Sequence, residues 1–254
     1  MEGRESIGPR AGSETTPVVE TRAVRKTFGA IVAVDGIDLS LPPGRIYGLI
    51  GPNGSGKTTL IRMLVGLTRP TGGEVLVLGE PMPSRTLLSR IGYMTQADGI
   101  YPELSVAENL RFFGDLYGGV TQAALDRILE LVDLRDRAGS PAVELSGGMR
   151  RRLSLACALV HGPSVLFLDE PTVGVDPALR VAFWDHFRSL AGAGATLLVS
   201  SHVMDEADRC DELLFIRSGR LIARGTADQL RRAGASDRLD DAFLRLASAG
   251  GETR

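Results

Sequence analysis

The chain has 254 residues, of which 43% are hydrophobic, so it can bury a sizeable core without disulfides or structural metal ions. Its 29 basic and 31 acidic residues give a formal net charge of -2, which argues against a broad basic surface for nucleic acid. The two cysteines, Cys157 and Cys210, lack the spacing of a metal site and are expected in a reduced, intracellular protein. No apolar run reaches the roughly 20 residues that a membrane-spanning helix needs, so another chain must supply any membrane part of the function.

The N-terminal part of the sequence predicts strands followed by a glycine-rich loop. Residues 1–17 are rich in Gly, Ser, Pro and charge, and we expect a disordered leader there. Residues 18–40 are β-branched and partly alternating, which predicts antiparallel strands around a turn at residues 28–29. Residues 45–50 (RIYGLI) predict a buried strand, and a helical pattern over 57–67 follows the loop.

Strand and helix patterns then alternate to the C-terminus. The predicted strands are 74–78, 91–94, 165–169 and 195–201, followed by a hairpin that turns at Ser218 and Gly219. Helical patterns cover 104–132, which predicts a helical insert, 177–190, and an amphipathic tail at 228–246. The apolar segments at 165–169 and 195–201 are typical of buried parallel strands, and each ends at polar residues.

The glycine-rich loop reads GPNGSGKTT and matches the phosphate-binding pattern G-x-x-x-x-G-K-[ST] in its required place between a strand and a helix. Glycines let successive N–H groups surround phosphate oxygens, and the helix N-terminus adds the positive end of its dipole. Lys57 is expected to reach the β and γ phosphates, Thr58 to bind Mg²⁺ and Thr59 to contact the α phosphate. A glycine-rich turn that only connects strand and helix is the alternative. The predicted phosphate-binding residues are Gly51, Pro52, Asn53, Gly54, Ser55, Gly56, Lys57, Thr58 and Thr59.

A second element of phosphate chemistry is the apolar segment VLFLDE, which ends in two carboxylates. An acid at the carboxyl end of a parallel strand lies beside the metal ion and the phosphates of a bound nucleotide. Asp169 is therefore expected to hold Mg²⁺ through water, and Glu170 to orient the attacking water. An ordinary strand end is the alternative, and the phosphate-binding loop in the same chain disfavours it.

Residues 145–149 read LSGGM and are followed by RRRLSLACALVHGPSVLFLDEPTVGVDP. With these motifs the chain resembles the ABC transporter ATPase family over roughly residues 18–246. The resemblance implies an α/β fold of the P-loop NTPase type: an ABC ATPase core with a mixed central sheet, an N-terminal antiparallel β subdomain and a helical subdomain insert. The implied boundaries are a leader at 1–17, an ATPase domain at 18–228 with the insert at about 97–158, and a helical tail at 229–254.

In that family the LSGG segment begins a helix and faces the γ-phosphate held by the other subunit of a head-to-tail dimer. The resemblance gives this role to Ser146, Gly147 and Gly148. The residue types agree, because serine is a good N-cap, glycine permits close backbone approach, and the helix dipole favours an anion. A plain helix cap is the alternative. Met149 stands where many family members have glutamine, and we expect hydrolysis to be retained because the phosphate-facing atoms come from the preceding residues.

The resemblance assigns roles to four further residues. Phe28 lies where the family has an aromatic residue that stacks on adenine, with a core aromatic as the alternative. Gln96 matches the glutamine that touches Mg²⁺ or its water and relays the nucleotide state to the membrane subunit. Asp176 matches a loop that communicates across the dimer. His202 matches the histidine that contacts the γ-phosphate and helps to hold the water.

Other polar residues are expected to have no chemical role. His161 and His186 lack any such match and are expected at the surface or in packing. Arg150, Arg151 and Arg152 are consecutive, and we expect a basic helix face beside an anion site or in solvent rather than a nucleic-acid site.

The resemblance implies an ATPase that uses ATP and Mg²⁺ and powers transport by ATP-driven dimerisation. The implied partners are a second copy or a similar subunit, and a separate integral membrane permease on whose cytoplasmic side the chain lies. The phrases YMTQ, LSGGMRRRLSLA, DEPTVGVDP and DDAFLRL are similar to the exporter branch, which includes drug, polysaccharide and lipid efflux systems.

Two other functional classes are considered. A soluble ABC ATPase of translation has two cassettes and one of DNA repair has a long coiled-coil or zinc insert, neither of which this sequence contains. An iron-sulfur assembly ATPase is a single cassette of similar size and stays open as the alternative. A small-molecule kinase has a P-loop but no reason to carry LSGG before VLFLDE, so it is disfavoured.

Overall fold

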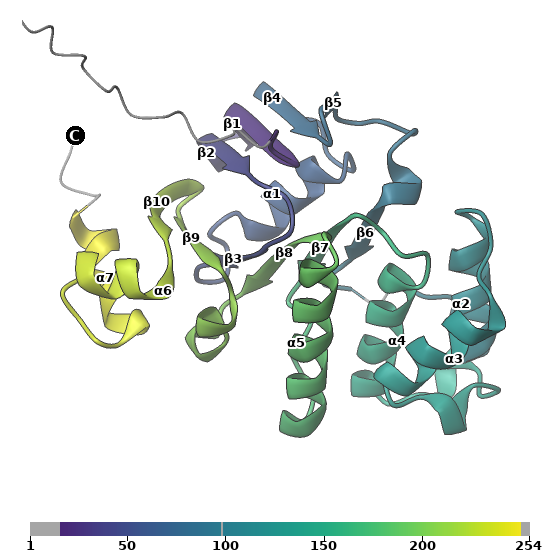
Figure 1. The fold of residues 1–254 in the computed structure, drawn as a ribbon. Helices are drawn as coiled ribbons and strands as arrows, with labels where there is room; N and C mark the ends of the chain where they lie inside the picture. The colour runs from purple at the N-terminus through teal and green to yellow at the C-terminus, as the bar shows by residue number, and fades with distance from the viewer. Residues whose placement is uncertain (1–15, 98, 250–254) are drawn as a thin grey trace, which may run out of the picture.

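The computed structural model describes residues 16–97 and 99–249, which form two β-sheets and the helices around them (Figure 1). The predicted leader lies outside the described residues except for residues 16 and 17, and the last five residues of the predicted tail also lie outside them.

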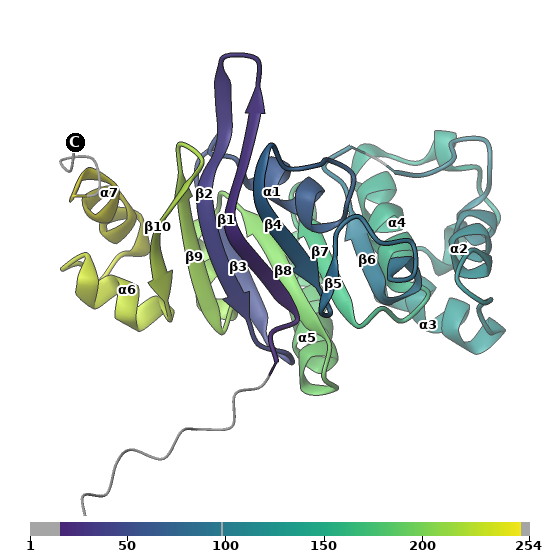
Figure 2. The ribbon, with the colours of Figure 1, turned by 90° about the horizontal axis from the view of Figure 1, so that it is seen from above.

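The first sheet is antiparallel, with strand order β2-β1-β4-β5. It consists of β1 (Val19–Phe28), β2 (Ile31–Leu41), β4 (Gly72–Val77) and β5 (Glu80–Pro81). The antiparallel pair predicted over residues 18–40 is confirmed, with Phe28 paired to Ile31 across the turn. The hairpin of β1 and β2 projects beyond its neighbours when the molecule is seen from above (Figure 2).

The second sheet has the order β10-β9-β3-β8-β7-β6. Its strands are β3 (Ile46–Ile50), β6 (Ile91–Met94), β7 (Val165–Asp169), β8 (Thr196–Ser201), β9 (Glu212–Arg217) and β10 (Arg220–Gly225). Strands β9, β3, β8, β7 and β6 are parallel, and β10 pairs antiparallel with β9, which confirms a mixed central sheet. Every residue of β3, β7 and β8 is buried, which explains their continuous apolar sequences.

Helices cover both faces of the central sheet. Helix α1 (Lys57–Leu64) lies between the two sheets, where it contacts β2, β4 and β7. It is shorter than the predicted 57–67 because Gly66 takes a left-handed backbone with φ of +77°. Helix α5 (Pro177–Gly192) packs against β3 and β8 and supplies Trp184 and Phe187 to the core.

Helices α2 (Val106–Asp115), α3 (Gln122–Leu131) and α4 (Gly147–Leu159) pack together at the β6 end of the sheet (Figure 1). The helical pattern predicted over 104–132 is confirmed and consists of two helices, which are separated where Gly118 and Gly119 have φ of +110° and +95°. Short 3-10 helices precede β6 (η1, Leu88–Arg90) and α4 (η2, Arg135–Arg137, and η3, Ala142–Glu144). The insert boundaries at about 97 and 158 stay a prediction.

The C-terminal elements lie at the opposite end of the sheet (Figure 1). After the 3-10 helix η4 (Met204–Arg209), helices α6 (Ala227–Ala233) and α7 (Leu239–Ala249) pack on β10. The tail predicted to be helical thus consists of two helices. Phe243 of α7 meets Phe215 edge to face, with ring centroids 5.1 Å apart. Among the residues that the structure describes, no helix has both the length and the apolar composition to span a membrane.

Candidate active site

The predicted catalytic residues lie at the carboxyl ends of β3, β6, β7 and β8, which meet along one edge of the central sheet. The phosphate-binding loop, residues 51–56, follows β3 and leads into α1. Lys57 is 5% exposed, and its Nζ donates to the carbonyl oxygens of Gly51 at 2.7 Å and Pro52 at 3.2 Å. The lysine is thus held over the preceding loop, and contact with the phosphates of a nucleotide stays the prediction for it.

The shape of the loop depends on two of its glycines. A Cβ at Gly51 would lie 2.2 Å from the Ile216 carbonyl oxygen. Gly56 has φ of +106°, and its Cβ would lie 2.4 Å from the Ala33 carbonyl oxygen of β2. Both positions therefore require glycine. The buried Ser55 hydroxyl has no hydrogen-bond partner among the described residues, as expected of a group that meets a ligand.

The two carboxylates at the end of β7 have different surroundings. Asp169 Oδ1 accepts a hydrogen bond from Ser200 Oγ at 2.5 Å, whereas the buried Oδ2 has no hydrogen-bond partner within the described part of the chain. Glu170 Oε1 lies 3.9 Å from Lys57 Nζ. The backbone of Glu170 is left-handed, with φ of +55°, and its N–H points at the Ser200 carbonyl oxygen, 3.2 Å away. Glu170 is therefore fixed at both backbone and side chain.

His202 follows β8 and completes this group of residues. Its Nδ1 lies 3.1 Å from Glu170 Oε1, and its side chain is 41% exposed. An ionised carboxylate can only accept, so Nδ1 donates and Nε2 is left for another partner. Glu170 Oε1 thus lies within reach of a cation and of an imidazole N–H.

Burial lowers the pKa of Lys57 below its usual 10.5, while the nearby carboxylates of Glu170 and Asp169 act in the opposite direction. A lysine destabilised in this way gains from an anionic ligand, because phosphate oxygens replace the lost hydration of its charge. The remaining loop residues are more open: Pro52, Asn53 and Gly54 are exposed, while Thr58 and Thr59 are half-buried in the first turn of α1.

The LSGG segment lies at the start of α4, on the other side of the carboxylates. Ser146 caps α4, since its Oγ accepts from Met149 N at 3.2 Å, and both Ser146 and Gly147 are exposed. A cavity of about 320 Å³ brings Gly147 and Gly148 together with Gln96 and Glu170 of the same chain. Ser146 is therefore a helix cap in this structure. That the exposed N–H groups bind a phosphate held by another subunit stays a prediction.

Asp176 and Phe28 lie further from the carboxylates. Asp176 caps α5, where its Oδ1 accepts from Leu179 N at 3.0 Å. Phe28 is 52% exposed at the tip of the β1–β2 hairpin, with Lys26 Nζ 5.0 Å from the centroid of its ring. The alternative that Phe28 is a core aromatic is wrong. Because β2 touches the phosphate-binding loop at Gly56, the hairpin that carries Phe28 borders the site.

Two residues at the site were not predicted from the sequence. Ser200 is buried in β8 and bonds to Asp169 through its hydroxyl and to Glu170 N through the same oxygen. Arg151 was expected on a basic helix face, beside an anion site or in solvent. It does not lie in solvent, because it is 8% exposed and bonds to the backbone at the ends of β6 and β7. In the sequence, Ser200 is a serine at the end of the apolar ATLLVSS segment, and Arg151 is the middle one of three consecutive arginines.

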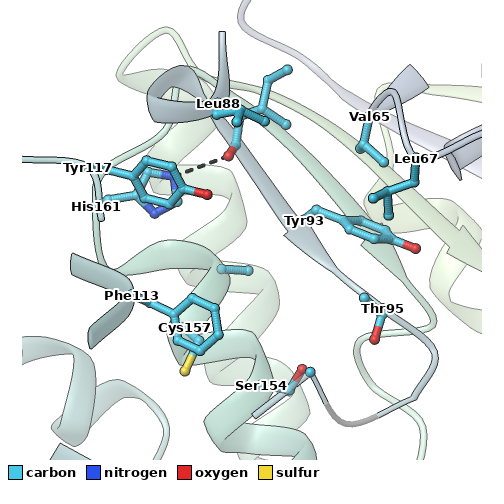
Figure 3. Close-up of a pocket in the computed structure, with 13 residues that line it drawn as sticks. Val65, Leu67, Leu88, Tyr93, Thr95, Phe113, Tyr117, Ser154, Cys157 and His161 are labelled. Atoms are coloured by element: carbon cyan, nitrogen blue, oxygen red, sulfur yellow. Dashed lines mark hydrogen bonds between the residues drawn. The ribbon is translucent and has the colours of Figure 1, made fainter. Parts of the chain in front are cut away.

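The structure also has a mainly apolar cavity of about 270 Å³ beside β6 (Figure 3). It is lined by Tyr93, Phe113 and Cys157, and by His161, whose ring packs 4.5 Å from that of Tyr117 and whose Nε2 bonds to the Ile91 carbonyl oxygen. None of the predicted nucleotide-binding residues lines this cavity, so it is distinct from the nucleotide site.

Comparison with known proteins identifies the family of the chain. The ABC transporter family matches residues 34–173, more than half of the chain. Over 221 residues the chain is 45% identical to the Nod factor export ATP-binding protein I of Cupriavidus metallidurans. This alignment covers 85% of this chain and 73% of that protein. Over 245 residues it is 40% identical to the probable multidrug ABC transporter ATP-binding protein YbhF of Escherichia coli. This alignment covers 92% of this chain and 42% of that protein.

A solved structure of the ATP-binding subunit of an ABC transporter has the same fold, with a TM-score of 0.83 and 28% identity over 91% of this chain and 99% of that one. Sequence similarity, fold and the grouping of lysine, carboxylates and histidine at one sheet edge lead to the same conclusion. The chain belongs to the ABC transporter family and is an ATP-binding, ATP-hydrolysing cassette.

Proposed function

We propose that this chain is the motor subunit of an exporter, in which two cassettes close on ATP and drive a separate permease. The observation that carries the hydrolytic part is the position of Glu170 Oε1, which lies 3.9 Å from Lys57 Nζ and 3.1 Å from His202 Nδ1. This arrangement supports a hydrolytic role, because such a reaction needs a carboxylate next to a cation that can bind the terminal phosphate.

In the proposed reaction, residues 51–59 hold the phosphates of ATP with backbone N–H groups, and Lys57 neutralises charge on the β and γ phosphates. Glu170 accepts a hydrogen bond from the attacking water and orients it toward the γ phosphorus. With both ring nitrogens protonated, His202 donates from Nδ1 to the carboxylate, which keeps it in place, and from Nε2 to the γ-phosphate. The exposed ring of Phe28 provides a surface on which adenine can stack.

The residues present suit a magnesium ion. Asp169 Oδ2 is buried without a hydrogen-bond partner in the described residues, so a cation or a metal-bound water would satisfy it. Thr58 and Gln96 would supply the other protein oxygens of this site. When bound, Mg²⁺ would offset the negative charge of the phosphates.

A second cassette would complete the site. Ser146 and Gly147 are exposed at the N-terminus of α4, and an N-terminus with free N–H groups favours a phosphate. A head-to-tail dimer would bring these residues and Gly148 to the γ-phosphate on the partner's loop, and Asp176 to the dimer interface. The partner is either a second copy of this chain or a similar subunit.

The direction of transport and the permease are inferred from relatives. The two relatives are named for Nod factor export and for multidrug transport, which favours export over an iron-sulfur assembly role. We place the chain at the cytoplasmic face of the membrane, bound to a separate permease.

Co-purification from native membranes tests this function. We expect tagged protein to retain a polytopic membrane protein and ATPase activity, and the matched Lys57→Ala protein to retain the partner without the activity. Soluble partners alone, such as an iron-sulfur scaffold, would contradict the transport role and leave the ATPase chemistry in place.

A further inference from the structure

Arg151 links two loops of the active site to helix α4. Its Nη1 donates to the carbonyl oxygens of Thr95 at 2.7 Å and Gln96 at 2.8 Å. Its Nη2 donates to the carbonyl oxygens of Asp169 and Glu170, the latter at 2.9 Å. One buried side chain therefore joins the segment after β6, the carboxylate pair after β7 and the helix that begins with LSGG.

The position of these acceptors explains why arginine is needed. Strands β6 and β7 are parallel neighbours whose last paired residues are Met94 and Leu168, so the four acceptor residues follow directly at the same sheet edge. Only guanidinium presents five N–H groups in one rigid plane, which lets it serve two pairs of carbonyls at once. A lysine at this position could donate to only some of the four carbonyl oxygens, and a glutamine to fewer still.

Glu170 shows what the contact controls. A left-handed backbone is unfavourable for a residue with a Cβ, and it persists only where the surroundings fix it. Ser200 holds the N–H of Glu170 and Arg151 holds its carbonyl oxygen. These two contacts fix the peptide groups on either side of the Glu170 Cα, and so set the direction in which its carboxylate points.

We propose that Arg151 is a positioning residue for hydrolysis, which keeps Glu170 in its reactive orientation and couples it to the Gln96 segment and to α4. This inference rests on the proposed roles of Glu170 and Gln96. None of the four carbonyls that Arg151 binds belongs to the phosphate-binding loop. Arg151 therefore affects the rate of hydrolysis and leaves the affinity for ATP unchanged.

The test compares Arg151→Gln and Arg151→Lys with the matched control Arg152→Gln in the full chain. Arg152 is the next residue of α4, and its Nη1 bonds to Val132 and Asp133, away from the strand ends. We expect Arg151→Gln to lower kcat by about ten-fold or more, with the Kd for a fluorescent ATP analogue within about three-fold of wild type. Arg151→Lys should recover part of kcat, and Arg152→Gln should keep the wild-type value.

Three further measurements separate positioning from loss of folding. Thermal unfolding identifies any variant that does not fold, in which case Arg151→Lys carries the test. In a protein that already carries Glu170→Gln, Arg151→Gln should lower kcat little further, because both changes impair the same function, the orientation of water by Glu170. Hydrogen exchange, which needs no turnover, should rise at residues 95–97 and 169–172 in Arg151→Gln but not in Arg152→Gln.

Wild-type kcat and exchange in Arg151→Gln would overturn the inference, and so would a loss of ATP affinity as large as the loss of kcat. Wild-type turnover in the single variant Glu170→Gln would instead show that the proposed role of Glu170 is wrong. The two failures are thus distinguishable.

Discussion

At the end of β7, Glu170 combines a left-handed backbone with a largely buried carboxylate that lies between a lysine and a histidine. A left-handed backbone costs about 1–2 kcal/mol for a residue with a Cβ. The contacts of Ser200 and Arg151 with its peptide groups offset that cost. The backbone strain is therefore located at the residue that we propose orients the attacking water, and such strain is common at active sites.

Replacing Glu170 by glutamine tests this assignment with little change in shape. The amide keeps the size of the side chain but no longer acts as a carboxylate toward water, so we expect turnover to fall by about 100-fold or more. ATP binding should persist, because the phosphate-binding loop is unchanged, and an ATP-bound dimer should accumulate on a sizing column. Glu74→Gln, at an exposed position of β4, is the control. Turnover of Glu170→Gln equal to that of the control would remove Glu170 from the reaction.

The lowered pKa of Lys57 predicts a pH dependence of ATP affinity. Burial favours the neutral amine in the free protein, whereas bound phosphates favour the ammonium, so the pKa is higher with ATP than without it. ATP binding is then accompanied by uptake of a proton in the pH window between the pKa of Lys57 in the free protein and its higher pKa in the complex. Affinity should therefore fall as pH rises through that window, which begins below the usual 10.5.

Titration with an ATP analogue between about pH 8 and pH 10.5 measures this slope. Lys57→Arg is the comparison, because guanidinium stays charged over this range and should give a flatter profile. Equal slopes in the two proteins would show that another group controls the affinity.

At the scale of elements, the sequence predicts the bounds of those strands and helices that are marked by neighbouring residues in the chain. Strands β6 and β7 have the predicted bounds, because apolar runs end at polar residues there. The helical pattern over 104–132 does not show where one helix ends and the next begins, and Gly118 and Gly119, with positive φ, separate α2 from α3. Sequence periodicity continues across such a break because both helices pack on the same core.

The N-caps of α2 and α4 offer a matched pair for the role of LSGG. Ser105 and Ser146 each accept a hydrogen bond from the N3 backbone at 3.2 Å. Replacing either by alanine should cost about 1 kcal/mol of unfolding free energy. For a domain of this size, that corresponds to a Tm lower by about 2–4 °C.

Only Ser146→Ala should also reduce ATP-dependent dimerisation and hydrolysis, because only α4 begins with residues proposed to meet a phosphate. Calorimetry, sizing chromatography and ATPase assays on both variants make the comparison. Equal losses in activity for Ser105→Ala and Ser146→Ala would favour a purely structural cap at Ser146.

At the scale of the whole molecule, the strand order could not be predicted from the sequence. The order β10-β9-β3-β8-β7-β6 places β3 between β8 and β9, although about 150 residues separate β3 from β8. The contact of Ser200 with Asp169 follows from this order, since β8 lies beside β7. Residue types indicate the chemistry, but long-range pairing decides which side chains surround it.

A dimer with sites shared between subunits makes a prediction that a monomeric site does not. The Lys57→Ala and Ser146→Arg proteins should each be inactive alone, because every site of either homodimer carries a lesion. In a mixed dimer both lesions fall in one site and the other site is intact. An equal mixture that exchanges subunits should therefore recover about a quarter of the wild-type sites. The ATPase rate of the mixture, compared with the sum of the separate proteins, measures this recovery.

The placement of the two lesions decides the result. Lys57 belongs to the phosphate-binding loop and Ser146 to the start of α4, so complementation requires that they act in one site from different chains. Mixing Lys57→Ala with Glu170→Gln is the control, because these residues lie in one site of one chain, 3.9 Å apart, and the mixed dimer has no intact site. Recovery only in the first mixture would establish the head-to-tail arrangement. No recovery in either mixture, with dimers present, would show that each chain works with its own LSGG segment.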